Sequence, residues 1–417
     1  MPTITARLLP LSYLLVATFP SCAQDEPFST PTFDRIDLQA NKLIFKGDST
    51  TFTAFHERLD ELLLHGKGNI DVLHVGGSHV QADMWSAQLR HRLQTMVPGV
   101  RGGRGFVFPY NMAKSNNPYW YNPEFTGTWT SAKNVVRSDS SSLGLSGYAV
   151  TTRDSLTTLR ITFRGTQYPG YVSDRVRIYH RMDSSFAVNA FTSDPAVLIT
   201  CTPRQAEGFT EFRFSRPLDT LQFRFTKEDP AQKRFTLYGI DLRNGDPGIT
   251  LSAVGVNGAS TGSWVRCDRF VQELATLPPH LVILSIGIND AHDTDFDAKA
   301  FERNYDELIR RIKATSPNAA IVLTTNNDSY IRRKVNNRNA TAVRASMLRL
   351  SATHGVAVWD LFTVMGGAGS MRHWQAAGLA KKDRIHFTRE GYVMLGDLLF
   401  TALMEHYAAH LSTAQNR

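Results

Sequence analysis

The segment Ile70-Asp71-Val72-Leu73-His74-Val75-Gly76-Gly77-Ser78 decides the fold class of this chain. Its first six residues are mostly apolar and rich in β-branched side chains, which is typical of a buried β-strand. The two glycines permit a tight turn. From Ser78 to about Met96 the sequence predicts a helix. A strand, a turn and a helix in direct succession are the repeating unit of a parallel sheet.

The same order of elements returns in the C-terminal part of the chain. The sequence predicts strands over 249–256, 281–286, 319–324 and 356–359, and helices over 51–64, 263–277, 297–314, 339–353 and 389–407. Continuous apolar strands that alternate with amphipathic helices are buried on both sides. We therefore expect an α/β fold, in which helices cover both faces of a parallel sheet.

The segment from 111 to 247 has a different pattern. Short alternating stretches follow one another, and clusters of turn-forming residues separate them. Six or more such strands without a helical period predict a β-sandwich. We therefore divide the 417 residues into a first part of an α/β domain (49–110), an inserted β-sandwich (111–247) and a second part of the α/β domain (248–410).

The N-terminus has the features of an export signal. Arg7 precedes an apolar run from Leu8 to Phe19, and small residues follow it. The run is too short for a permanent membrane helix. We expect residues 1–23 to be a signal peptide and 24–48 an exposed leader. Cleavage after Ala23 and lipidation of Cys22 are both open, so the protein is expected to be periplasmic or secreted, with a membrane anchor only if Cys22 is lipidated.

Charge and cysteine content exclude some classes of partner. The 46 basic and 38 acidic residues give a net charge of +8, which favours acidic polymers as partners. The charges are scattered, and no basic array suited to a phosphate backbone is present, so nucleic acid is not expected.

Outside the signal, Cys201 and Cys267 fit buried thiols better than a disulfide. With no CxxC or HExxH motif, we expect no metal site. We also expect no cofactor, because the candidate nucleophile, base and electrostatic stabiliser described below are side chains or backbone groups.

Three residues form a candidate catalytic group. Ser78 would lie on an exposed corner at the start of a helix, beside backbone N–H groups. Asp383 and His386 are three residues apart before the last helix, a spacing that lets the carboxylate reach the imidazole. Taken singly, each of the three residues also fits a plain helix cap. Together they match a nucleophile, a base and the group that orients the base.

Two loops at the ends of predicted parallel strands add hydrogen-bond donors. Sites collect at this edge of such sheets. Gly258, in Val256-Asn257-Gly258-Ala259-Ser260, can bring its backbone N–H close to a substrate oxygen, and Asn289 can offer a side-chain amide. With the N–H of Ser78 they form a predicted oxyanion hole of three donors.

Four segments, GGSHVQAD, GVNGAS, SIGIND and DRIHFTREGY, resemble in this order the four blocks of the SGNH, or GDSL-like, hydrolases. The resemblance covers about 50–110 and 248–410, and implies a three-layer, flavodoxin-like α/β/α domain. It also implies that Ser78 is the nucleophile, His386 the base and Asp383 its partner, with Gly258 and Asn289 as oxyanion donors. The chain departs from the family at Gly77, where an Asp is usual; we expect activity to persist.

The long gap between Ser78 and Gly258 makes the architecture similar to that of peptidoglycan and polysaccharide O-acetylesterases, whose insert resembles a jelly-roll or carbohydrate-binding module. This implies a serine esterase that removes O-acyl groups, above all O-acetyl, from a cell-surface or extracellular glycan. A lipase or general esterase, a glycan O-acetyltransferase and an inactive glycan-binding protein are the alternatives. Arg104, Tyr110 and Trp120 are candidate substrate-binding residues. The sequence gives no indication of the oligomeric state.

Overall fold

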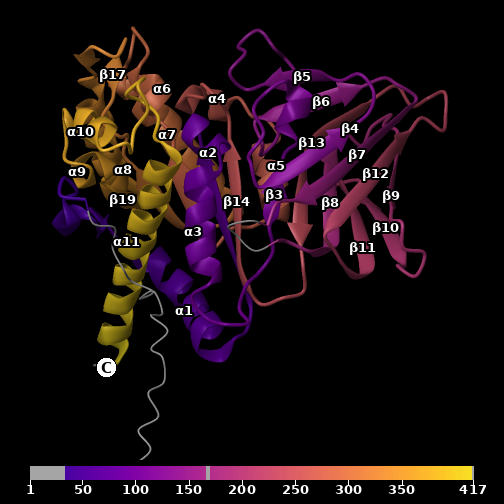
Figure 1. Cartoon of the computed structure of the whole chain (residues 1–417), viewed down its shortest axis with the longest axis horizontal. Coiled ribbons are helices and arrows are strands. Elements are labelled where there is room, and N and C mark those ends of the chain that lie inside the picture. The colour runs from indigo at the N-terminus through magenta and orange to yellow at the C-terminus, as the bar shows by residue number, and fades with distance from the viewer. Residues whose placement is uncertain (1–32, 166–169, 416–417) are drawn as a thin grey trace, which may run out of the picture.

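The computed structural model describes residues 33–165 and 170–415. The predicted signal peptide and the first part of the predicted leader lie outside these residues. Figure 1 shows two parts side by side, one of helices around a sheet and one of antiparallel strands. None of the helices in the two described ranges combines the length and the apolar character needed to cross a membrane.

The main sheet joins the two predicted parts of the α/β domain. Its six strands follow the order β1-β19-β16-β15-β2-β14, and all pairs are parallel except β1 with β19. β2 pairs with β14 along its whole length, although the insert separates them in the sequence. The bounds are β1 Leu43–Ile44, β2 Asn69–Gly76, β14 Gly248–Gly255, β15 Leu281–Ser285, β16 Ala320–Thr324 and β19 Ala357–Trp359.

Helices cover both faces of this sheet, because alternate side chains of each strand point to opposite faces. On β2, Val72 belongs to one buried cluster and Leu73 to another. The Val72 side packs against α1 (Thr50–His65), α3 (Met84–Gln94) and α11 (Arg389–Gln415). The Leu73 side packs against α4 (Thr261–Val265), α5 (Phe270–Thr276), α7 (Ala298–Thr315) and α8 (Asn339–His354). The predicted three-layer fold is confirmed.

The insert consists of two antiparallel sheets. One has the order β10-β11-β8-β13-β6-β5, with β3 also paired to β13, and the other has the order β4-β7-β12-β9. Aromatic side chains fill the space between them; the rings of Phe225 and Phe235 stack with centroids 4.1 Å apart. The bounds are β3 Gly105–Val107, β4 Tyr121–Phe125, β5 Thr130–Lys133, β6 Tyr148–Thr152, β7 Leu156–Phe163, β8 Ser173–His180, β9 Ala187–Phe191, β10 Ile199–Arg204, β11 Phe209–Leu218, β12 Thr220–Thr226 and β13 Phe235–Arg243.

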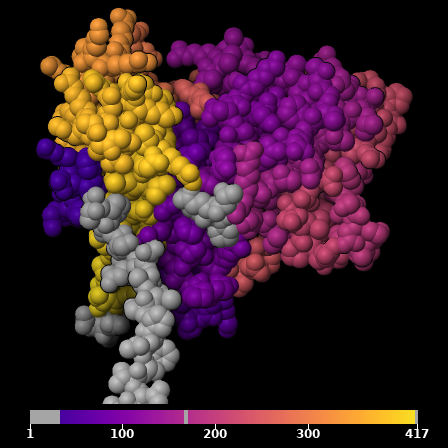
Figure 2. Space-filling model, in the orientation of Figure 1, coloured from indigo at the N-terminus to yellow at the C-terminus, as the bar shows by residue number. Residues whose placement is uncertain are grey.

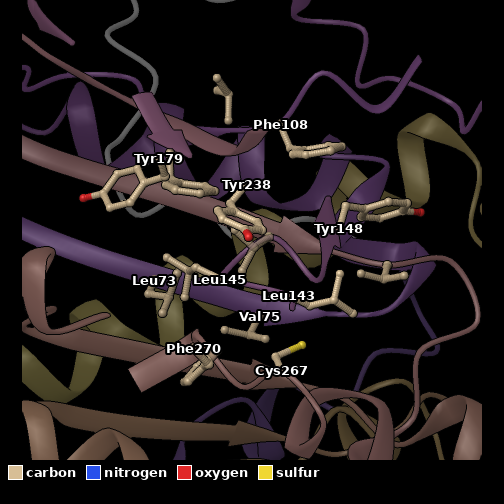
Figure 3. Packing of buried hydrophobic residues seen from close by; sticks show 14 of the residues in the cluster. Leu73, Val75, Phe108, Leu143, Leu145, Tyr148, Tyr179, Tyr238, Cys267 and Phe270 are labelled. Carbon is tan, nitrogen blue, oxygen red and sulfur yellow. The ribbon is translucent and has the colours of Figure 1, made fainter. Parts of the chain in front are cut away.

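The sandwich and the α/β part share one buried core. Figure 3 shows Leu73 and Val75 of β2 and Cys267 and Phe270 near α5 beside aromatic side chains of the insert, such as Tyr238. The two parts are also linked by β3, which pairs with β13 and donates a backbone N–H to the hydroxyl of Ser252 on β14 (2.9 Å). Figure 2 shows the sandwich, in purple to rose, against the rest of the molecule. The insert is therefore a fixed part of the molecule.

The structure corrects several predicted elements. The helix predicted from Ser78 to Met96 is two helices, α2 (Ser78–Gln81) and α3, because Asp83 between them has φ +50°. The helix predicted over 263–277 is likewise split into α4 and α5, and α11 continues to Gln415. Part of the predicted leader is not exposed, since Leu43 is buried and β1 pairs with β19.

The remaining elements are short. They are the 3₁₀ turns η1 (Leu38–Ala40) and η2 (Tyr110–Ala113), the helices α6 (Ile288–Ala291), α9 (Leu361–Val364) and α10 (Ser370–Ala376), and the two-stranded β17 (Tyr330–Ile331) and β18 (Val335–Asn336). Both Cys201 and Cys267 are free thiols; Cys267 is buried as predicted, whereas Cys201 is exposed on β10.

Candidate active site

The turn after β2 places Ser78 at the start of α2. A side chain at Gly76 would collide with Val80 and come within 2.8 Å of the carbonyl oxygen of Ser285. Only glycine at position 76 therefore lets α2 lie this close to the end of the strand. Ser78 itself is half-buried, so its hydroxyl is held at the surface of the sheet edge.

Ser78, His386 and Asp383 form a continuous hydrogen-bonded line. The Oγ of Ser78 lies 2.8 Å from Nε2 of His386, and Nδ1 of His386 lies 2.9 Å from Oδ2 of Asp383. The imidazole therefore has one nitrogen toward a hydroxyl and the other toward a carboxylate. This is the arrangement in which a histidine can take a proton from a serine while a carboxylate stabilises the charge that forms.

The Asp383 carboxylate is held in its charged form. Burial alone would raise its pKa. The carboxylate accepts hydrogen bonds from the backbone N–H groups of His386 (3.0 Å) and Ile385 (2.9 Å) and from the His386 side chain. Together these bonds outweigh burial and lower the pKa below its ordinary value. A carboxylate that accepts several N–H donors remains an anion beside the imidazole at neutral pH.

A strained turn sets the geometry of the Asp383–His386 segment. Arg384 has φ +56°, which is uncommon for a residue with a side chain. Two hydrogen bonds hold Arg384 in this conformation. Its guanidinium donates to Oε1 of Gln375 (2.7 Å) and to the carbonyl oxygen of Arg333 (2.8 Å). The turn is therefore anchored to α10 and to the β17–β18 hairpin.

Gly258 and Asn289 meet beside the nucleophile turn. Gly258 is exposed, with φ +83°, and a Cβ added there would meet no atom closer than 3.9 Å. The amide nitrogen of Asn289 donates to the carbonyl oxygen of Ala259 (2.9 Å), and a Cβ at Gly77 would lie 3.2 Å from that nitrogen. The structure thus brings Gly77, Gly258 and Asn289 to one side of Ser78.

Gln81 connects these groups, and the sequence analysis did not single it out. Its side-chain oxygen accepts the backbone N–H of Asn257 (2.7 Å), and its nitrogen donates to the hydroxyl of Ser115 (2.8 Å) and the carbonyl oxygen of Asn116 (3.0 Å). The buried Gln81 therefore joins the nucleophile helix, the Gly258 loop and the start of the insert. Its place in GGSHVQAD, three residues after Ser78, is the signal that could have identified it.

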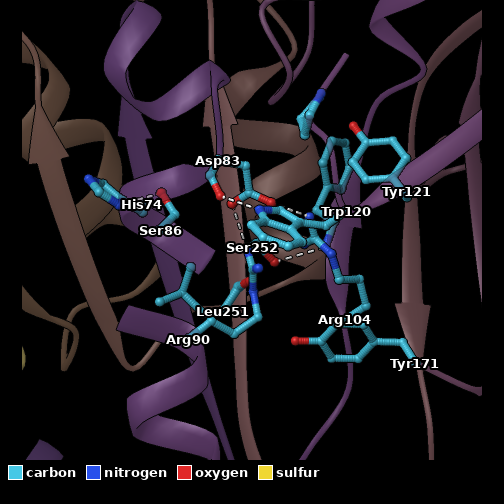
Figure 4. A network of polar contacts seen from close by, with 12 residues as sticks. His74, Asp83, Ser86, Arg90, Arg104, Trp120, Tyr121, Tyr171, Leu251 and Ser252 are labelled. Carbon is cyan, nitrogen blue, oxygen red and sulfur yellow. Dashed lines mark hydrogen bonds and ion pairs between the residues drawn. The ribbon is translucent and has the colours of Figure 1, made fainter. Parts of the chain in front are cut away.

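The three candidate substrate-binding residues lie in the interior, which corrects that prediction. Arg104, Tyr110 and Trp120 are all 4% exposed or less. Figure 4 shows Arg104 turned toward Asp83, which it meets at 2.7 Å, while the indole of Trp120 donates to the carbonyl oxygen of the same residue (2.9 Å). Tyr110 packs edge-on against the ring of Phe108 (5.3 Å). Arg104 and Trp120 thus bind the turn after α2, and Tyr110 lies in the buried core.

Within residues 33–165 and 170–415, no group of histidine, cysteine and acidic side chains is placed to hold a metal ion. Around Ser78, the imidazole of His386 is bonded to the Ser78 hydroxyl and to the Asp383 carboxylate. The amide of Asn289 is bonded to a backbone carbonyl oxygen. The chemistry that this site offers is that of a hydroxyl nucleophile with a neighbouring base.

Comparison with known families supports this description. Residues 228–394 match the model of the GDSL-like Lipase/Acylhydrolase family. The chain contains a GDSL-like hydrolase domain. The match includes four of the five predicted catalytic positions, Gly258, Asn289, Asp383 and His386, whereas Ser78 lies before it because the insert separates β2 from β14. The prediction of an SGNH-type serine hydrolase is confirmed at the level of the family.

One solved structure confirms the fold of the hydrolase domain together with its insert. A structure entitled "Peptidoglycan O-acetylesterase in action, 5 min" superimposes with a TM-score of 0.72 at 23% identity, over 88% of this chain and 99% of that chain. The acetylxylan esterase Axe2 from Geobacillus stearothermophilus (TM-score 0.31, 17% identity) covers 37% of this chain and 73% of its own. A GDSL-like lipase from Bacteroides thetaiotaomicron (0.31, 18%) covers 38% and 76%. No curated protein matches the chain.

Proposed function

We propose that this GDSL-like hydrolase is an exported serine esterase that removes O-acyl groups, above all O-acetyl groups, from a cell-surface or extracellular glycan such as peptidoglycan. The observation that carries the proposal is the line from Ser78 through His386 to Asp383, with separations of 2.8 and 2.9 Å. An inactive binding protein would have no need of this line, and Gly77 does not disturb it.

The proposed reaction proceeds through an acyl-enzyme. The Oγ of Ser78 attacks the ester carbonyl carbon while Nε2 of His386 takes its proton, and Asp383 stabilises the imidazolium. The N–H groups of Ser78 and Gly258 and the amide of Asn289 hold the oxyanion. The imidazolium then gives its proton to the sugar oxygen as the bond from that oxygen to the acyl carbon breaks, so the sugar leaves with a free hydroxyl. A water molecule, activated by the same imidazole, then attacks the acyl-enzyme, releases the acid and restores Ser78.

The position of the insert supports a glycan as the leaving group. Asn116 of the insert accepts a hydrogen bond from the Asn257 side chain (2.6 Å), next to Gly258. Val135, also of the insert, supplies the atom nearest to the open side of Gly258. A substrate bound at Gly258 would therefore meet the β-sandwich as well. The net charge of +8 suits an acidic polymer, and the similar fold of a protein called a peptidoglycan O-acetylesterase agrees with this substrate class.

The test compares purified wild-type protein with Ser78→Ala on aryl acetate, aryl octanoate and O-acetylated peptidoglycan. The matched control is Ser140→Ala, an exposed serine in the insert. We expect cleavage of the acetyl ester and of the polymer, with a loss of at least about 10³-fold in Ser78→Ala and none in the control. A preference for octanoate would indicate a general acyl esterase. Equal activity of Ser78→Ala and wild type would refute the proposal.

A further inference from the structure

Three buried polar groups close to the catalytic line have no partner within the described residues. They are Nε2 of His79, Nε1 of Trp85 and Nδ2 of Asn326. The three residues are 7%, 3% and 6% exposed, so bulk water does not satisfy them. Buried polar atoms in native proteins are nearly always paired, and three such atoms in one place therefore require an explanation.

The same three residues line one small cavity. It has a volume of about 20 Å³, and apolar side chains of Ile288, Phe387 and Leu395 form part of its wall. A polar cavity needs about 10–15 Å³ to admit one water molecule, and a water needs two to four polar partners. This cavity therefore matches a single water in both volume and number of partners.

We propose that one structural water molecule occupies this cavity and that, through it, His79 acts as a positioning residue for His386. The water oxygen accepts hydrogen bonds from Trp85 Nε1–H and Asn326 Nδ2–H. One O–H group of the water donates a hydrogen bond to Nε2 of His79. Trp85 and Asn326 offer only donors at these atoms, so the water must be the donor toward His79. The role assigned to His79 rests on the proposed catalytic function of Ser78 and His386.

This arrangement fixes the side chain against which the catalytic imidazole packs. With Nε2 as the acceptor, the ring proton of His79 lies on Nδ1, which is 2.7 Å from the hydroxyl of Tyr392. The His79 ring is thus held at both nitrogens. Its centroid lies 5.1 Å from that of His386, at an angle of 47°. A ring that follows Ser78 in the chain and contacts His386 in space limits how the imidazole can tilt relative to the nucleophile.

A neutral His79 is required beside a base that becomes charged. Burial is the main cause that lowers the pKa of His79 to about 3, and the neighbouring His386 lowers it further. His79 therefore stays uncharged at neutral pH and does not repel the imidazolium at His386. The water preserves this state because it satisfies the ring nitrogen without supplying a charge.

The first test is a high-resolution crystal structure of the wild-type protein. We expect one ordered water within 2.7–3.2 Å of all three nitrogen atoms, the range for an N–H···O hydrogen bond. A dry cavity, or a water that contacts none of these atoms, would overturn the proposal. This result does not depend on the substrate, so it can fail while the proposed esterase activity stands.

The second test displaces the water. Asn326→Leu removes one donor and fills the cavity, whereas Asn318→Leu makes the same change at an exposed residue. We expect Asn326→Leu to lower kcat on aryl acetate by about tenfold, because the imidazole is misplaced, with KM within twofold of wild type and no change in the control. Asn326→Ser, which keeps a donor, should restore kcat to within about threefold.

Trp85→Phe provides an independent variant, because it removes the N–H and keeps an aromatic ring. We expect the same loss of kcat without a change in KM. If Asn326→Leu does not fold, Trp85→Phe decides the question. A wild-type kcat in either folded variant would show that the water does not position His386.

Discussion

The carboxylate of Asp290 accepts hydrogen bonds from two groups of Thr261, the backbone N–H, which lies 3.1 Å from both oxygens, and the hydroxyl (2.6 Å). Asp290 follows Asn289, and Thr261 lies three residues after Gly258. The contact therefore fixes the distance between two of the predicted oxyanion donors. Burial raises the pKa of Asp290 and the bonds from Thr261 oppose this rise, so the carboxylate depends on these donors.

We expect Asp290→Ala to lower kcat on aryl acetate by about tenfold, because the Gly258 loop loses its anchor to Asn289. It should also lower the free energy of unfolding by about 1–3 kcal/mol, since the N–H of Thr261 loses its partner. Steady-state kinetics and urea unfolding measure the two effects. Asp293→Ala, an exposed neighbour, is the control. A normal kcat in Asp290→Ala would show that this contact does not position the donors.

Gly258→Ala separates backbone strain from catalysis. Gly258 has φ +83° and Gly99 has φ +82°, and a Cβ meets no close neighbour at either position. Each Gly→Ala change should therefore cost a similar 1–2 kcal/mol of stability. We expect only Gly258→Ala to lower kcat, because its methyl group would project into the space beside the predicted oxyanion donor. Equal activity of the two variants would argue against a role for Gly258 in the reaction.

Asn289→Ala should lower kcat by roughly 10²- to 10³-fold with little change in KM, the usual effect of removing one oxyanion donor. The bond from Asn289 to Ala259 is lost as well, so a structural contribution must be separated. Asn289→Asp keeps an oxygen at the site but removes the donor, and we expect it to be at least as inactive. If Asn289→Asp retained wild-type kcat, the amide would not be an oxyanion donor.

The sequence was sufficient for the parallel sheet and for the grouping of the reactive residues. The strand at Ile70–Val75 is buried on both sides, so its apolar character shows in the sequence without any tertiary information. Three of the predicted catalytic residues follow strands of the sheet: Ser78, Gly258 and Asn289. The fourth, His386, precedes the last helix at the same edge, and parallel strands bring such positions together. Their proximity therefore follows from the topology.

The break after α2 and the place of Arg104 could not be predicted in the same way. Asp83 adopts φ +50° while its carboxylate is held by Arg90 (2.9 Å) and Arg104 (2.7 Å), which come from α3 and from the segment before β3. An ion pair between distant residues overrides the local helical preference. From sequence alone, an arginine in a glycine-rich segment looks exposed, and nothing nearby shows that its partner is a buried aspartate.

Glu273 gives the protein a specific dependence of stability on pH. Its side chain is fully buried, and the carboxylate accepts the backbone N–H of Leu145 (2.7 Å) and contacts Arg269 (3.4 Å). Burial raises its pKa to about 7, although Leu145 and Arg269 act in the opposite direction. Glu273 therefore binds a proton more tightly in the folded state than in the unfolded state, where its pKa is about 4.3.

The sign of the effect follows from proton linkage. Between about pH 4.3 and 7 the folded state holds more protons at Glu273, so the free energy of unfolding falls as pH rises through this range and levels off above it. The fall attributable to this residue is up to about 4 kcal/mol. We expect Glu273→Gln, measured by urea unfolding at pH 5, 6, 7 and 8, to remove this fall, while the exposed Glu228→Gln retains it. Because Gln can still accept the N–H of Leu145, the variant should be more stable than wild type at pH 8. Parallel pH profiles for Glu273→Gln and wild type would show that the buried carboxyl does not titrate in this range.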